Sequence, residues 1–148
     1  MKRILAAVDF SPVTGDVVRV TGDLAHALHA EVRLLHVVAP EPEFVGYSPG
    51  PVTVREQMAQ IYREEHRQLQ AIEAAMREEG SGVSSLMVQG DAAAKILKIA
   101  AEYGAGLIVL GSHGHGALHH LIAGSVASGV LKASPRPVLI VPAARREK

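Results

Sequence analysis

The chain has 148 residues, of which 48% are apolar, which is enough to build the core of one domain spanning residues 1–148. Fifteen lysines and arginines balance fifteen aspartates and glutamates, so the composition indicates neither a nucleic-acid partner nor an anionic membrane surface. The absence of cysteine excludes disulfides and thiolate zinc sites and favours a reducing compartment, with the cytoplasm as the expected location.

The N-terminal half predicts two strands and two helices. The apolar run over residues 4–8 predicts a buried strand. Ser11 and Pro12 then provide an N-cap and a first helical position for a helix with an apolar face. A second buried strand over residues 32–38 is followed by a segment rich in proline and glycine, residues 40–52. A second helix is predicted over residues 54–79, with these apolar residues near a 3.6-residue period: Val54, Met58, Ile61, Leu69, Ile72 and Met76.

The C-terminal half continues the same alternation. Strands are predicted over residues 85–88, 107–110 and 138–141, with helices over 92–103 and 117–132 between them. Strands that are buried on both faces and alternate with helices require a parallel sheet, because right-handed crossovers place helices on both sides. The predicted fold is therefore a three-layer α/β domain with five open parallel strands and four helices, of the Rossmann-like kind.

Two of the predicted strands end in distinctive residues. The first strand ends in AVDFSP and delivers Asp9, and the fourth ends in LGSHGHG. Ligands of open parallel sheets bind beyond the carboxyl ends of the strands, where the winding direction reverses. If these two strands are neighbours at that point, Asp9 and Gly111 face one another across one crevice.

The glycines after the fourth strand are suited to a phosphate group. Gly111, Gly114 and Gly116 let backbone amides approach a ligand without an intervening Cβ. Gly124 and Ser125 interrupt an apolar pattern, which predicts that the chain folds back so that both glycine-containing bends donate amides to one anion. The fourth helix would then begin closer to Ser125 than its periodicity indicates.

Other nucleotide and catalytic motifs do not occur. No glycine is followed by lysine, which excludes a Walker loop, and the first strand is followed by DFSP rather than by GxGxxG. The chain also contains no CxxC, GxSxG or HExxH.

The combined pattern resembles the universal stress protein family. Gly111-x-x-Gly114, nine residues and Gly124-Ser125 match its nucleotide motif GxxGx9G[ST]. AVDFS at 7–11, HVV at 36–38 and SPRPVLIVP at 134–142 are similar to its first, second and closing strands. The resemblance implies an ATP-binding protein with strand order 3-2-1-4-5, acting as a nucleotide-dependent stress-response or regulatory module toward unknown protein partners. It also implies a homodimer joined through the last strand, Val138, Leu139, Ile140 and Val141, which that order leaves at a sheet edge.

The resemblance also implies a role for each matching residue. Asp9 would contact the ribose or adenine side, the main chain at Val37 would read the adenine edge, and Ala7 would line the same pocket. Gly111 would pack under the ribose. The phosphates, with their Mg²⁺, would be held by Ser112, His113, Gly114, His115, Gly124, Ser125 and Val126.

Several alternatives stay open at this point. Asp9 also suits a capping role, the glycines suit turns, and AMP or ADP suits the pocket as well as ATP does. A slow ATP hydrolase is the second function, although residues 111–125 contain no lysine or arginine to neutralise a γ-phosphate. A metal-binding protein is the third, based on His113, His115, His119 and His120, although no nearby carboxylate or cysteine completes a ligand set.

Overall fold

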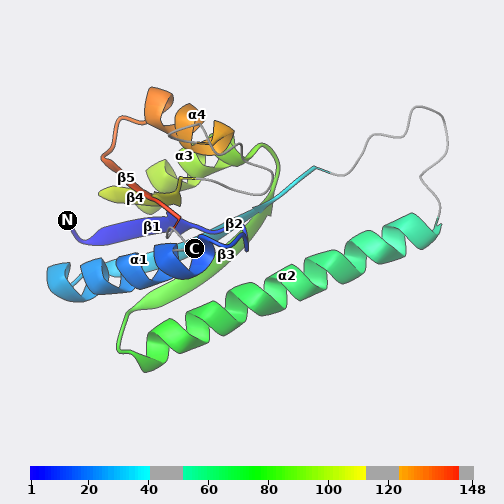
Figure 1. The fold of residues 1–148 in the computed structure, drawn as a ribbon, viewed down its shortest axis with the longest axis horizontal. Coiled ribbons are helices and arrows are strands. Elements are labelled where there is room, and N and C mark those ends of the chain that lie inside the picture. Colours follow the sequence, from blue (N-terminus) through cyan, green and yellow to red (C-terminus); the bar gives the residue numbers. More distant parts are fainter. Residues whose placement is uncertain (41–51, 113–123, 144–148) are drawn as a thin grey trace, which may run out of the picture.

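The protein is a layered α/β structure with a central parallel sheet (Figure 1). A computed structural model describes residues 1–40, 52–112 and 124–143. The sheet has the order β3-β2-β1-β4-β5, and every pair of neighbouring strands is parallel. This confirms the predicted fold class and strand order. The strands are β1 Arg3–Ala7, β2 Glu31–Val38, β3 Val83–Gln89, β4 Leu107–Gly111 and β5 Val138–Val141.

Two helices cover each face of the sheet. The helices are α1 Thr14–Leu28, α2 Val52–Glu78, α3 Ala92–Tyr103 and α4 Ser125–Ala133. Because side chains alternate across a strand, Ile4 packs with residues of α1 and α2, whereas Leu5 packs with residues of α3 and α4. The nearly continuous apolar runs in the strands are thus explained by burial on both faces.

The start of α1 differs from the prediction. The helix begins at Thr14 after Val13, which makes no side-chain capping bond, so Ser11 is not its N-cap and Pro12 is not its first residue. The amide of Ser11 donates to Oδ1 of Asp9 at 3.0 Å, and the carbonyl of Ser11 accepts from the amide of Thr14 at 3.0 Å. Two successive turns, one closed by the Asp9 side chain and one from Ser11 to Thr14, therefore occupy the predicted cap and first positions of the helix.

The first half of α2 packs less than its periodicity predicts. Leu69 is 0% exposed and Met76 is also buried, but Ile61 is 49% exposed. A helix of 27 residues is about 40 Å long, whereas the eight residues of β2 span about 26 Å. The helix is therefore longer than the sheet is tall, and its first half reaches beyond the sheet (Figure 1).

The third helix and the last strand match their predicted bounds, but the fourth helix does not. Gly124 is extended, with ψ of 172°, and α4 begins at Ser125 instead of residue 117. This agrees with the expectation that the helix starts near Ser125. Residues 117–123 and 41–51 lie outside the described part of the chain. Within residues 1–40, 52–112 and 124–143, no helix has the length and apolar character needed to cross a membrane.

Candidate functional site

The carboxyl ends of β1 and β4 lie side by side, as the proposed crevice requires. Ile4 pairs with Leu107 and Ala6 pairs with Val109, so the residues that follow both strands emerge at the same edge of the sheet. Ala7 and Val37 are partly buried and pack toward the α3 and α4 face. The structure therefore gathers Ala7, Asp9, Val37 and Gly111 at one edge of three adjacent strands.

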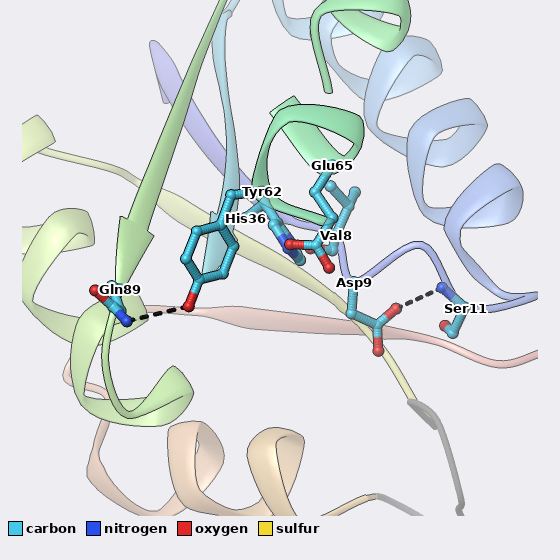
Figure 2. A network of polar contacts seen from close by, with 7 residues as sticks. All are labelled: Val8, Asp9, Ser11, His36, Tyr62, Glu65 and Gln89. Carbon is cyan, nitrogen blue, oxygen red and sulfur yellow. Dashed lines mark hydrogen bonds and ion pairs between the residues drawn. The ribbon is translucent and has the colours of Figure 1, made fainter. Parts of the chain in front are cut away.

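Asp9 is exposed at the tip of β1, and its side chain takes part in the local turn. Its Oδ1 accepts the amide hydrogen of Ser11 (Figure 2). The next residue, Phe10, has a φ of 59°, a left-handed conformation that costs a residue with a side chain about 1–2 kcal/mol. With this bond Asp9 closes a turn that precedes α1, whereas the alternative expected it to cap the helix. Its predicted ligand contact stays a prediction.

A buried histidine, His36, contacts this turn from the α1 and α2 face of the sheet, which is opposite to the face of Ala7 and Val37. Nδ1 of His36 lies 2.8 Å from the carbonyl oxygen of Val8, and Nε2 lies 3.0 Å from Oε2 of Glu65 on α2 (Figure 2). The ring of His36 also contacts that of Phe10, with centroids 4.5 Å apart. Sequence reasoning missed this cluster. Its one signal is a polar residue within the apolar run of β2, and nothing local connects that residue to position 65.

A second polar contact joins α2 to the same edge. The amide nitrogen of the Gln89 side chain donates to the hydroxyl of Tyr62 at 3.3 Å (Figure 2). Tyr62 is one helical turn before Glu65, so α2 is attached to the tips of β2 and β3 by adjacent turns.

The absence of a side chain at Gly111 has a packing explanation. A Cβ added at this position would lie 2.4 Å from Cγ1 of Val13, which is buried against the sheet. The close approach of the residues before α1 to the end of β4 therefore requires glycine. The proposed contact of Gly111 with a ribose remains a separate prediction.

The two ends of the glycine-containing segment meet. The amide of Gly124 donates to the carbonyl of Ser112, and the amide of Ser112 donates to the carbonyl of Val141 at 2.8 Å. Gly124 precedes α4 without a side-chain cap, and Ser125 and Val126 are exposed in the first turn. The start of α4 thus lies beside the end of β4. His113, Gly114 and His115 lie outside the described residues.

The metal-binding alternative depends on four histidines of the segment between β4 and α4. His113, His115, His119 and His120 are outside the described residues, and the described part of the chain contains no group of three or more potential metal ligands.

A separate hollow of about 620 Å³ lies at the opposite edge of the sheet. Its basic residues, Lys2 and Arg3, face the C-terminal ends of α1 and α3, which carry partial negative charge. Arg3 is also 3.7 Å from Glu31 and donates to the carbonyl of Tyr103. Burial, followed by Glu31, raises the pKa of Tyr103 above its ordinary value, against the opposing effect of Arg33 and Arg3. The charges of this hollow are therefore largely balanced internally.

Known proteins resemble this chain along most of its length. The universal stress protein YxiE of Bacillus subtilis is 32% identical over 144 residues, covering 94% of this chain and 97% of YxiE. The solved structure of MJ0577 from Methanocaldococcus jannaschii is 28% identical, covers 99% of this chain and 98% of its own, and has a TM-score of 0.80. A universal stress protein of Archaeoglobus fulgidus in complex with dAMP shares the fold at 21% identity, with a TM-score of 0.68 and coverage of 95% and 97%.

A family model gives the same assignment. The model for the universal stress protein family matches residues 1–142, which include every strand and helix named above. The chain therefore belongs to the universal stress protein family.

Proposed function

We propose that this protein binds an adenine nucleotide, ATP with Mg²⁺ in the first place, at the edge formed by the tips of β2, β1 and β4. The adenine and ribose would lie over Ala7, Asp9 and Val37, and the phosphates would lie between the end of β4 and the start of α4. In this role the protein is a cytoplasmic stress-response module whose nucleotide state biases the surface that partner proteins contact.

The observation that carries the proposal is the contact between Ser112 and Gly124 at the tip of β4. It places the uncapped amides at the start of α4 next to the strand that adjoins Asp9, and free amides at a helix N-terminus favour an anion. The dAMP bound to the Archaeoglobus fulgidus protein is in keeping with an adenine nucleotide. The residues present thus fit a phosphate held by main-chain groups.

Gly114→Val should weaken ATP binding at least about a hundredfold, which corresponds to about 2.7 kcal/mol. A branched side chain in the glycine motif should block the approach of the phosphates to the main-chain amides. Isothermal titration of both proteins with MgATP measures the change.

Gly22→Val provides the matched control. It introduces the same side chain in α1, where an added Cβ would have no atom within 4 Å. This variant should bind MgATP like the wild type. Near-normal binding by a folded Gly114→Val variant would show that the phosphates lie elsewhere.

Mass spectrometry of the protein as purified should reveal bound ATP. Bound ADP or AMP would instead identify the ligand that is retained, and release of phosphate from added ATP would support the slow hydrolase. Zinc or nickel in place of a nucleotide would contradict the proposal and support the metal-binding alternative.

We further propose that two copies pair through β5. This strand is at the edge of the sheet, and Val138, Leu139 and Ile140 are only partly buried there. An apolar edge with unpaired backbone groups favours pairing with a second strand, and closed two-fold pairing satisfies both copies. Sedimentation equilibrium at micromolar concentration should therefore give twice the monomer mass of 15.6 kDa. A single species at the monomer mass would contradict this pairing.

A further inference from the structure

His36 contacts both residues that flank Asp9. Its Nδ1 is 2.8 Å from the carbonyl oxygen of Val8, and its ring is packed against Phe10 with centroids 4.5 Å apart. Phe10 has the left-handed conformation that turns the chain after β1. Because the residues on both sides are held, the direction in which Asp9 leaves the strand depends on His36.

The side chain of His36 lies on the face of the sheet that α1 and α2 cover, and the candidate site lies toward the other face. Val8 belongs to the core cluster on the α1 and α2 face, and His36 reaches Glu65 of α2 on that same face. The neighbouring residues Ala7 and Val37 pack toward α3 and α4 instead. His36 is therefore not placed to contact a nucleotide lying over Ala7 and Val37, and its influence on such a ligand must pass through the tip of β1.

The hydrogen bonds of His36 also determine the total number of ionisable hydrogens on its imidazole ring and the Glu65 carboxyl group. The Val8 carbonyl can only accept, so Nδ1 must carry a hydrogen. Nε2 faces a carboxylate at 3.0 Å, so a hydrogen must also lie between these two atoms, on one or the other. The His36–Glu65 pair therefore holds one proton more than a neutral imidazole and a carboxylate hold. The His36 side chain is 6% exposed, which limits exchange of these bonds for bonds to water.

We propose that His36, hydrogen-bonded to Glu65, is the positioning residue of the nucleotide site, because its bond to the Val8 carbonyl fixes the residue before Asp9 and thereby aims Asp9. This proposal rests on the proposed nucleotide-binding function. It adds that Glu65 on α2 contacts His36, which in turn contacts Val8, the residue before Asp9. A change in α2 could therefore alter the position of Asp9. Asp9 and Tyr62, which are also ionisable, lie near this pair (Figure 2).

Nitrogen NMR of the His36 ring tests the shared proton. In the wild type at neutral pH, Nδ1 should carry a hydrogen, and a second hydrogen should be found either on Nε2 or on the Glu65 carboxyl, whose protonation carbon NMR detects. In Glu65→Gln the amide can donate to Nε2, so only Nδ1 should remain protonated while the fold and the bond to Val8 persist. A wild-type ring with only one protonated nitrogen beside an ionised Glu65 carboxylate would overturn the shared proton.

Two variants of His36 test the positioning role. Asparagine places a donor near the position of Nδ1, so His36→Asn should keep the bond to Val8 and bind MgATP within about threefold of the wild type. Glutamine reaches toward Glu65 instead, so His36→Gln should leave the buried Val8 carbonyl unpaired and raise the Kd about tenfold. Equal dissociation constants for the two variants would overturn the proposal.

Tyr62→Phe is the control on the same helix. It removes the bond to Gln89 one turn from Glu65 and leaves the bonds of His36 to Val8 and Glu65 in place, so the Kd should change less than about twofold. A wild-type protein that binds no nucleotide would refute the proposed function, and the positioning role with it, while the NMR comparison would still decide the state of the pair. If Gly114→Val abolishes binding and His36→Gln leaves the Kd unchanged, the function stands and the positioning role is wrong.

Discussion

Leu69→Ala is expected to lower the free energy of unfolding by about 2–5 kcal/mol, the range for emptying a fully buried leucine site. Leu69 is 0% exposed and belongs to the core cluster with Ile4, Leu34 and Met76, where α2 covers the sheet. This loss of stability has two parts: the hydrophobic free energy of burying the removed methyl groups, and the cost of the cavity that they leave. Urea denaturation of both proteins measures the difference, with an unchanged dependence of stability on urea as the sign that only stability has changed.

Ile61→Ala on the same helix is the control, because it tests whether the loss depends on burial of the side chain. Ile61 has the same side-chain volume and the same predicted face, but it is 49% exposed. Its replacement should change the stability by no more than about 0.5 kcal/mol. Similar losses for the two variants would mean that the first half of α2 is packed as firmly as the second.

Gly111→Ala is expected to destabilise the protein by about 1–3 kcal/mol, the usual cost of overpacking a core. The added Cβ would lie 2.4 Å from Cγ1 of Val13, a branched residue with little rotamer freedom. Either Val13 or the tip of β4 must move. Denaturation should be measured without nucleotide, so that any loss of ligand affinity does not contribute.

A double-mutant cycle identifies the cause. Val13→Ala removes the obstructing methyl groups, so Gly111→Ala should cost at least about 1 kcal/mol less in that background than in the wild type. Gly22→Ala in α1 serves as the control, because its added Cβ meets no atom within 4 Å, and it should stabilise the helix by up to about 1 kcal/mol. Additive effects of the first two substitutions would show that Val13 is not the reason for glycine at position 111.

The identity of the elements was predictable because periodicity and burial are local consequences of composition. Nearly continuous apolar runs predicted all five strands, and β5 and α3 match their predicted ranges. The strand order followed from the family resemblance and is confirmed. The candidate edge was predictable as well, since residues after parallel strands emerge on one side of the sheet.

What the sequence by itself determined is the fold class and, given the strand order that the resemblance implied, the edge of the sheet at which Asp9 and Gly111 emerge. Only the tertiary structure decided where α1 begins, which residues of α2 are buried, why residue 111 is glycine and how His36 is used. The start of α1 depends on competition between a helix cap and the Asp9 turn, and the exposure of Ile61 depends on the height of the sheet. The contacts of Gly111 with Val13 and of His36 with Glu65 join residues distant in the chain, and no local pattern encodes such pairs.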